Sequence, residues 1–323
     1  MKNFPLRITI ALMLAFCLQG FQNMTAQTIY ALSGDKLVSF EASNPAVLTQ
    51  SLSISGLAVG HSLMGLDFRP ATGQLYALGY NSVSGAAELY TIDRNTAVAT
   101  KIGNGPITLN PNITDFGFDF NPTVDRIRVT GSDNSNYRLH PVTGALVATD
   151  GNLAFAAADV NAAADPNVVA SAYTNSYIGA TSTTLYNFDA SLNVLVTQVP
   201  PNNGTLNTIG GTGLTLNTID QSVDIDITMD GMTGNNSAFL VANTDASLND
   251  ELYRLNLTTG ATTLVGSIGG GIPVRDIAVL IERIVPANVT GTLLYALTSG
   301  NNLISFDSNL PGVVRSLVAV TGI

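Results

Sequence analysis

Short apolar runs alternate with polar turn residues along most of this chain. The clearest unit contains four such runs, at residues 65–70, 74–78, 88–93 and 97–102. Gly, Pro, Asn and Thr separate the runs, and this combination is typical of short strands joined by tight turns. The pattern predicts a four-stranded antiparallel sheet over residues 65–104.

The same order of runs recurs along the chain. Residues 117–148 repeat it clearly, and looser copies open near Ala158 and Ile225. A fifth opening strand, at 275–280, has no continuation after it, whereas residues 28–54 match strands two to four of a unit and lack a first strand. We therefore predict that N- and C-terminal strands share one blade and close a ring, which removes most free sheet edges.

These observations predict an all-β fold, a β-propeller of five four-stranded blades over residues 27–285. Six blades, or a β-sandwich, are the alternatives. Several opening strands are apolar at nearly every position, as expected for innermost strands buried on both faces. Each opening strand also carries an aspartate, and these aspartates are separated by 52, 40, 67 and 50 residues. Such uneven spacing favours blades with variable loops over a solenoid.

The last part of the chain, 286–323, is a partial repeat of the start of the domain. Three segments match in order: 294–297, 303–307 and 320–323 repeat 29–32, 37–41 and 54–57. One interpretation is that the tail begins a second propeller. The other is that it competes with residues 28–57 for the Asp276 strand. We favour the first, because the match stays in phase over the whole tail.

Charge excludes several classes of partner. The chain has 13 Lys and Arg against 23 Asp and Glu, a net charge of −10. Nucleic acid and anionic membranes would be repelled, since no basic stripe offsets the acidic balance. No stretch after the first residues is long and apolar enough to span a bilayer.

Residues 1–26 have the pattern of an export signal. Lys2 and Arg7 precede an apolar run, and Ala26 ends the segment with a small residue. We predict cleavage near Ala26 and a secreted, periplasmic or cell-surface protein. Acylation at Cys17 as a lipoprotein is disfavoured, because Phe16 fits poorly before such a cysteine. Cys17 is the only cysteine, so the processed chain would have no disulfide and no cysteine-based metal site.

Several motifs of the chain resemble those of a known bacterial family. Residues 65–78 read Gly-Leu-Asp-Phe-Arg-Pro-Ala-Thr-Gly-Gln-Leu-Tyr-Ala-Leu, and 115–129 and 29–32 carry related patterns in the same order. Over residues 28–283 the chain is similar to the family called domain of unknown function 4394. The resemblance implies an exported bacterial protein with a propeller-like fold. It implies no activity, so no catalytic residue is carried over.

The recurrent aspartate is the main candidate for chemistry. Its members share a place on the predicted innermost strands: Asp67, Asp119, Asp159, Asp226 and Asp276. Around a central channel these carboxylates could bind a hard cation such as Ca²⁺. Alternatively, each accepts hydrogen bonds from backbone N–H groups of its own or the neighbouring blade. We favour this structural latch, because the motif recurs in every unit, and we predict no cofactor.

Other candidates are weaker. His61 and His140 lack the spacing of a zinc site, and His140 takes a turn position held by Asp93 and Asn256 in other units. The absence of Trp argues against a lectin. We therefore expect an exported, non-catalytic binding or interaction module for an extracellular or periplasmic protein or glycan. The alternative is a hydrolase or lyase that uses carboxylates, with or without Ca²⁺, in the channel.

Overall fold

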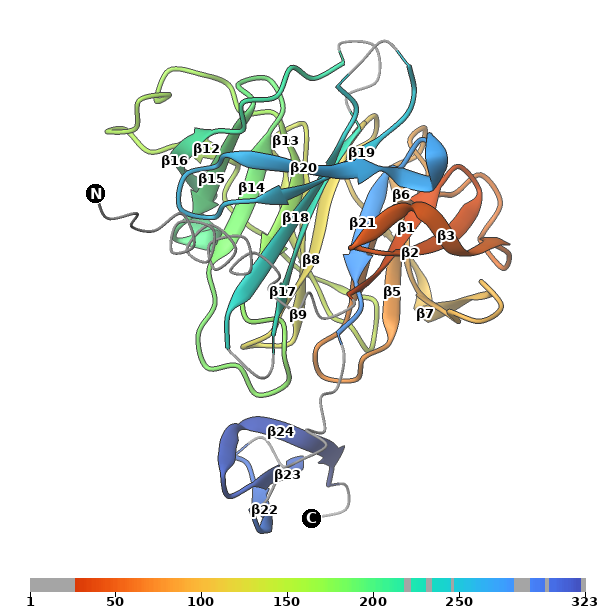
Figure 1. The fold of residues 1–323 in the computed structure, drawn as a ribbon, viewed down its shortest axis with the longest axis vertical. Helices are drawn as coiled ribbons and strands as arrows, with labels where there is room; N and C mark the ends of the chain where they lie inside the picture. Colours follow the sequence, from red (N-terminus) through yellow and green to blue (C-terminus); the bar gives the residue numbers. More distant parts are fainter. Residues whose placement is uncertain are drawn as a thin grey trace, which may run out of the picture.

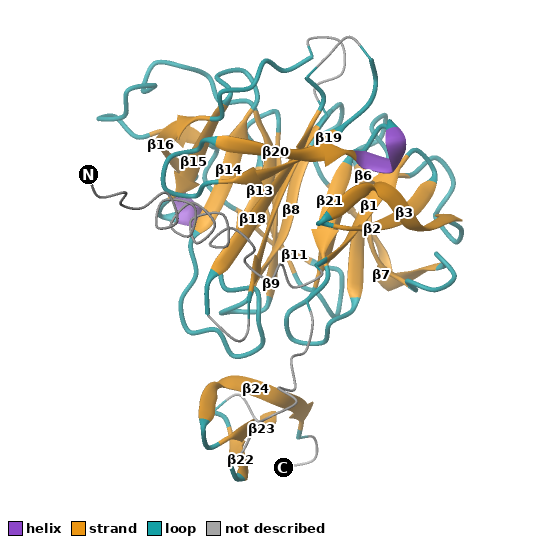
Figure 2. Ribbon diagram, viewed as in Figure 1, coloured by secondary structure: helices purple, strands orange, loops and turns teal. Residues whose placement is uncertain are grey.

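The computed structural model describes residues 27–217, 222–230, 234–244, 247–281, 291–299 and 302–320. Its architecture is almost entirely β, with five sheets in a ring and a sixth, three-stranded sheet near the C-terminus (Figures 1 and 2). Two single-turn 3₁₀ helices, η1 (Pro201–Asn203) and η2 (Ile268–Gly270), are the helical elements in the described part. No helix there is long and apolar enough to cross a membrane. The predicted signal, residues 1–26, lies outside the described residues.

The five blades are numbered in the order in which their second strands occur in the chain. Blade 1 contains, from the centre outward, β21 (Asp276–Val279), β1 (Thr28–Ser33), β2 (Lys36–Glu41) and β3 (Asn44–Ser53). Blade 2 contains β4 (Ser62–Phe68), β5 (Leu75–Tyr80), β6 (Ala86–Ile92) and β7 (Ala99–Thr108). Blade 3 contains β8 (Phe116–Asn121), β9 (Arg126–Gly131), β10 (Asn136–Leu139) and β11 (Leu146–Thr149).

Blades 4 and 5 complete the ring. Blade 4 contains β13 (Val168–Tyr173), β14 (Leu185–Asp189), β15 (Val194–Gln198) and β16 (Thr205–Gly211), with β12 (Ala154–Phe155) added parallel to β16. Blade 5 contains β17 (Val223–Met229), β18 (Asn236–Ala242), β19 (Glu251–Leu255) and β20 (Thr262–Ser267).

The innermost strands contact one another in a closed circle. β4 lies against β8, β8 against β13, β13 against β17, β17 against β21, and β21 against β4. β21 also pairs antiparallel with β1, with Leu32 opposite Asp276 and Ile29 opposite Val279. The predicted five-bladed propeller, closed by N- and C-terminal strands, is therefore confirmed. A six-bladed ring and a sandwich do not describe it.

Apolar side chains fill the spaces between blades. Between blades 2 and 3, Tyr76 packs edge-on against Phe120 with ring centroids 5.0 Å apart, and Tyr80 packs likewise against Phe116 at 4.9 Å. Corresponding apolar clusters join blades 4 and 5, blades 5 and 1, and blades 1 and 2. The innermost strands lie between the centre of the ring and the rest of their blades, and they are buried along almost their whole length.

Polar turn residues end the third strands. His140 Nδ1 accepts hydrogen bonds from the N–H groups of Val142 and Thr143. In the same way Asp93 receives two backbone N–H groups in blade 2, and Asn256 receives two in blade 5. The turn role predicted for His140 is thus confirmed, since all three side chains stabilise the same kind of turn.

Blade 4 departs from the sequence prediction. Residues 158–161 were expected as its first strand, but they lie in the loop between β12 and β13. The innermost strand of this blade is instead β13, and β14 is the second strand. The error arose because β13 carries no aspartate to mark it, whereas the loop does.

The tail forms its own sheet of β22 (Leu293–Leu297), β23 (Asn302–Asp307) and β24 (Leu310–Ala319). Its register reproduces that of blade 1. Tyr295 lies opposite Ser305 as Tyr30 lies opposite Ser39, and the register shifts around Phe306 repeat those around Phe40. The sheet thus contains counterparts of β1, β2 and β3 and, among the described residues, no counterpart of β21.

Candidate functional site

The innermost strands place two rings of residues around the channel. Backbone pairing aligns the strands: Asp67 lies opposite Tyr76, Ala172 opposite Tyr186, and Ala278 opposite Tyr30. The lower ring contains Asp67, Asp119, Ala172, Asp226 and Ala278. The upper ring, two residues earlier on each strand, contains Gly65, Gly117, Ala170, Asp224 and Asp276.

This alignment restores an even repeat. The lower-ring positions are separated by 52 residues from Asp67 to Asp119, 53 to Ala172, 54 to Asp226 and 52 to Ala278. The uneven spacing seen in the sequence came from counting Asp159 and Asp276 as members of this ring. Asp276 belongs to the upper ring instead, level with Asp224.

Each ring aspartate binds the backbone of the next blade by one rule. On the next innermost strand, one residue lies in the same ring as the aspartate. The carboxylate accepts the backbone N–H of the residue directly after that one. Asp67 Oδ2 accepts from Phe120 N at 2.8 Å, and Asp119 Oδ1 accepts from Tyr173 N at 3.2 Å.

The remaining three aspartates obey the same rule across the closing blade. Asp226 and Asp224 accept from the N–H groups of Val279 and Ile277, and Asp276 accepts from that of Leu66. The hydrogen bonds of a latch between blades are thus present at every ring aspartate. They add buried hydrogen bonds between the blades to the apolar packing there.

Glycine at the upper ring lets neighbouring strands approach closely. A Cβ on Gly65 would lie 2.4 Å from the Cβ of Phe118, and one on Gly117 would lie 2.2 Å from Ser171 Oγ. Both distances are far below van der Waals contact, so a larger residue would force blades 2, 3 and 4 apart.

Asp159, predicted as a fifth ring member, lies elsewhere. From the loop before β13 its carboxylate accepts the N–H and the hydroxyl of Thr208, at 2.6 and 2.7 Å, and the N–H of Asn161. Partial burial acts to raise the pKa of Asp159, but these hydrogen bonds outweigh it and hold the pKa below its ordinary value. Asp159 therefore fastens the outer strand β16 to this loop and takes no part in the channel.

Asp224, by contrast, was missed. It precedes Asp226 by two residues, and an Asp-x-Asp pair on a strand puts both side chains on one face. That spacing was the signal available in the sequence.

The ring carboxyls are deeply buried. Asp119 and Asp276 are each 2 % exposed, and the other three are at most 6 % exposed. Burial first, and neighbouring carboxylates second, raise the pKa of Asp67, Asp119 and Asp276 well above the ordinary value. Burial likewise raises the pKa of Asp224, and it raises that of Asp226 to about 7.

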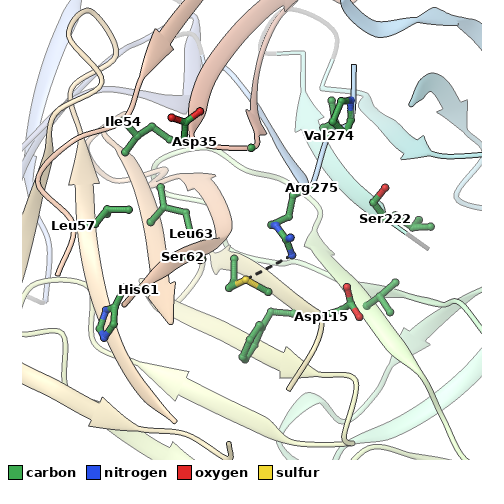
Figure 3. Close-up of a pocket in the computed structure, with 16 residues that line it drawn as sticks. Asp35, Ile54, Leu57, His61, Ser62, Leu63, Asp115, Ser222, Val274 and Arg275 are labelled. Atoms are coloured by element: carbon green, nitrogen blue, oxygen red, sulfur yellow. Dashed lines mark hydrogen bonds between the residues drawn. The ribbon is translucent and has the colours of Figure 1, made fainter. Parts of the chain in front are cut away.

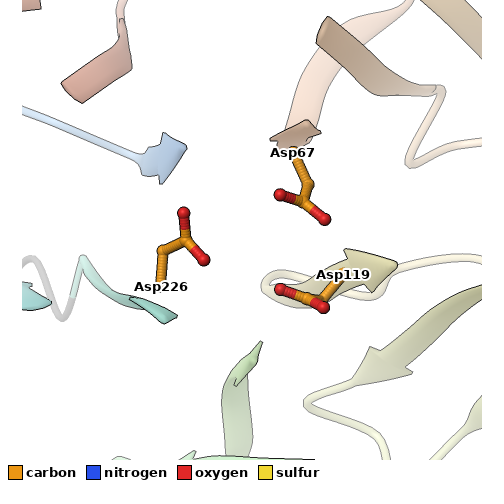
Figure 4. A group of neighbouring side chains, drawn as sticks. All are labelled: Asp67, Asp119 and Asp226. Atoms are coloured by element: carbon orange, nitrogen blue, oxygen red, sulfur yellow. The ribbon is translucent and has the colours of Figure 1, made fainter. Parts of the chain in front are cut away.

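Three lower-ring carboxylates face a common point (Figure 4). Asp67, Asp119 and Asp226 each offer one oxygen, and these oxygens lie within 4.8 Å of one another. None of the ion pairs among the described residues includes one of these three aspartates, so no arginine or lysine there neutralises their charge.

Above the rings, the channel opens into a pocket of about 670 Å³ (Figure 3). All five blades contribute to it, mostly through the starts of their innermost strands. Its lining includes Met64, Phe116, Val169, Val223 and Arg275. Since Val223 and Arg275 directly precede Asp224 and Asp276, the upper ring lies immediately below the pocket.

A charged residue stands free at this mouth. The exposed Arg275 guanidinium contacts Met64 Sδ at 3.6 Å, the one interaction of its side chain among the described residues (Figure 3). Asp35 and Asp115 also line the pocket. Neither forms an ion pair with another described residue. A few charged groups among apolar side chains are typical of sites that orient a ligand.

His61 lines the same pocket beside a buried acid. Tyr90 donates its hydroxyl hydrogen to Glu88 Oε2 at 2.6 Å, and Lys101 lies 3.4 Å from Oε1. His61 Nδ1 is 3.8 Å from Glu88 Oε2, too far for a hydrogen bond, and has no hydrogen-bond partner. Burial, reinforced by the bond to Glu88, raises the pKa of Tyr90 to about 12. Tyr90 and Lys101 thus satisfy this buried acid beside the pocket.

Comparison with known proteins adds the family. The chain resembles several solved structures. One is a nidogen/laminin complex, with 13 % identity over 91 % of this chain and 94 % of that one and a TM-score of 0.42. Another is the glutaminyl cyclase of Myxococcus xanthus, with 10 % identity over 74 % of this chain and 95 % of that one and a TM-score of 0.44. A Lactobacillus plantarum protein matches at 14 % identity, over 91 % of this chain and 82 % of that one, with a TM-score of 0.38. No curated protein matches. The family model described as a domain of unknown function, DUF4394, matches residues 36–278. The chain belongs to the DUF4394 family.

Proposed function

We propose that this chain is an exported, non-catalytic binding module that holds a segment of an extracellular or periplasmic protein at the mouth of its channel. The observation that carries the proposal is the pocket itself. It is formed jointly by all five blades, and its volume of about 670 Å³ falls within the range of ligand sites. Loops and strand ends on a rigid ring are where propellers have room for recognition.

The lining favours a peptide segment with a carboxylate. Arg275 is exposed and has no ion-pair partner among the described residues, so it could bind a carboxylate through two parallel N–H groups. Asp35 and Asp115 could bind amide or basic groups of the same segment. Apolar side chains of Leu57 and Met64 would cover its aliphatic parts.

A glycan fits this pocket less well. The chain has no Trp, and the aromatic residue of the lining, Phe116, is 3 % exposed. A sugar ring would therefore find no aromatic face on which to stack.

The alternative, a carboxylate-dependent hydrolase or lyase in the channel, is less well supported. The ring carboxylates are buried below the pocket, and each accepts a backbone N–H of the next blade. A general acid or base must reach the reacting group, and these carboxylates lie buried beneath the pocket.

A paired array experiment tests the function. The full chain is applied to tiled peptides of exported proteins and, in parallel, to a glycan array. We expect peptide binding that falls by about tenfold or more in Arg275→Glu, because the charge reversal repels the bound carboxylate. Arg126→Glu is the matched control, since Arg126 lines a different pocket between blades 3 and 4. Equal binding by Arg275→Glu and wild type, or binding to glycans alone, would contradict the proposal.

Export is tested separately. The proposed leader predicts that the protein recovered outside the cytoplasm begins at Gln27. N-terminal sequencing of the exported protein checks this, and an intact Met1 on the recovered protein would contradict it.

A further inference from the structure

We propose that the lower ring of the channel is a calcium site, formed by Asp67, Asp119 and Asp226 from blades 2, 3 and 5. The proposal is independent of the peptide ligand. It concerns the buried carboxylates below the pocket, which the proposed binding function does not use.

The geometry suits a hard cation. The three carboxylate oxygens come within 4.8 Å of one another. Calcium takes oxygen ligands at about 2.3–2.6 Å, so three ligands spread evenly around one ion are roughly 4.0–4.5 Å apart, and closer if they share one side of it. The spacing of the three aspartate oxygens allows this arrangement, so they can share a single ion (Figure 4).

The existing hydrogen bonds leave room for coordination. A carboxylate offers about four lone-pair sites. Asp67 uses one on Oδ1 for Phe68 N and one on Oδ2 for Phe120 N. Asp119 accepts only from Tyr173, through Oδ1, among the described residues. The latch hydrogen bonds thus fix the direction of each carboxylate and leave some of its lone pairs free to bind an ion.

A buried oxygen without a partner points independently to a ligand. Asp276 Oδ1, in the upper ring, accepts no hydrogen bond although the residue is 2 % exposed. Its charge interacts with Asp224, Asp67 and Asp226, so it lies among the same carboxyls. An unsatisfied buried acceptor is costly, and a water ligand of an ion in the lower ring would satisfy Asp276 Oδ1.

Charge balance requires a counterion or protons. Five buried carboxyls lie in two adjacent rings, and no described ion pair includes any of them. Buried charges are stable when paired or bound to metal. A divalent ion would neutralise two of these charges at once and would reach them through the pocket, whose floor adjoins the upper ring.

Calcium is favoured over magnesium. The three ligands are fixed on strands of separate blades, and Ca²⁺ accepts irregular geometry with long bonds. Mg²⁺ demands a near-ideal octahedron at about 2.0–2.1 Å and gives up its waters reluctantly. A rigid ring cannot contract to meet that demand.

Titration calorimetry on the full chain, stripped of metal and held at about pH 8, tests the site with Ca²⁺ alone. We expect one Ca²⁺ per chain, binding in or tighter than the range of about 10⁻⁴–10⁻³ M of extracellular calcium modules, and a higher melting temperature with Ca²⁺. Mg²⁺ should bind at least about tenfold more weakly.

Two variants and a control separate a metal site from a folding effect. Asp226→Asn and Asp119→Asn keep a side-chain oxygen for the backbone N–H but lose a ligand charge, so each should weaken Ca²⁺ binding by about tenfold or more. Asp159→Asn should bind Ca²⁺ as wild type does, because Asp159 lies outside the rings. The metal-free melting temperatures of both ring variants show whether they fold.

Three results would overturn the proposal. They are no Ca²⁺ binding by the metal-free wild type at about 10 mM, tighter binding of Mg²⁺ than of Ca²⁺, and equal loss of Ca²⁺ binding in Asp159→Asn and Asp226→Asn.

Discussion

Asp67 Oδ2 on blade 2 accepts a hydrogen bond of 2.8 Å from the backbone N–H of Phe120 on blade 3. Both groups are buried, and the same contact recurs from blade 3 to blade 4 and from blade 5 to blade 1. A backbone donor buried between two sheets must find a partner. The aspartate supplies it and thereby sets the height at which one blade lies against the next.

Replacement of Asp67 tests this latch. Asp67→Ala leaves the buried N–H of Phe120 without an acceptor and should lower the free energy of unfolding by about 1–3 kcal/mol. Asp67→Asn keeps an oxygen at the same place and should cost less. Urea unfolding of both variants measures the difference. Equal destabilisation would show that the hydrogen bond to Phe120 is unimportant.

The ring carboxyls predict an unusual dependence of stability on pH. Burial raises the pKa of these groups, to about 7 for Asp226. The pKa of an unfolded Asp is about 3.9. At a pH between this value and the raised pKa of the folded state, the folded chain therefore binds more protons than the unfolded chain. Stability is therefore fully present below the unfolded pKa and is lost as pH rises through the folded pKa. The melting temperature in metal-free buffer should be higher at about pH 5 than at about pH 8.

Calcium should reverse this trend. Binding requires deprotonated carboxylates, so Ca²⁺ should raise the melting temperature more at about pH 8 than at about pH 5. Calorimetric melting at both pH values, with and without Ca²⁺, checks both statements. A metal-free melting temperature that rises steadily from pH 5 to pH 8 would show that the ring carboxyls are ionised in the folded chain.

A second buried charge network lies between blades 3 and 4. Arg128 is 3 % exposed and donates to Asp150 Oδ2 at 2.6 Å, and Asp150 also binds Arg138. Asp150→Asn should destabilise the chain by about 3 kcal/mol, because it leaves the Arg128 charge buried without a counter-charge.

The matched control is Asp125→Asn. Asp125 pairs with Arg69 at a site where the Asp125 side chain is 38 % exposed, so its loss should cost less than the loss of the more deeply buried Asp150. Denaturant unfolding of both variants compares the two pairs. Similar losses would mean that burial adds nothing to the Asp150 network.

Truncation tests the role of the tail. β21 already pairs with β1, so the ring closes without β22–β24. If the tail belongs to a separate module, residues 27–285 should melt at the same temperature as residues 27–323. Marked destabilisation on truncation would favour the alternative, in which the tail contributes to the ring. Scanning calorimetry of the two proteins decides between them.

The sequence predicted the blades of the propeller better than the residues that line its channel. Repeats such as 65–78 and 117–129 revealed the blades, since turn residues and alternating apolar runs are local signals. β13 was misplaced because Ala170 and Ala172 occupy its ring positions, so no carboxylate marked the strand. The nearby Asp159 satisfied the same motif from a loop.

The pocket could not be read from the sequence for a different reason. Met64, Phe116, Val169, Val223 and Arg275 are far apart along the chain and meet only when the ring closes. Their positions before the ring strands have no distinctive composition.

The ring to which each aspartate belongs could not be predicted from the sequence either. Whether Asp276 lies level with Asp67 or with Asp224 depends on how β21 pairs with β1. The structure shows Leu32 opposite Asp276, which places Asp276 level with Asp224.

The most direct test of the carboxylate core is a crystal structure of the full chain grown with Ca²⁺, with anomalous scattering used to locate the ion. We expect one anomalous peak in the channel, about 2.3–2.6 Å from oxygens of Asp67, Asp119 and Asp226. A channel with no peak, or a peak only at sites away from these three residues, would contradict it.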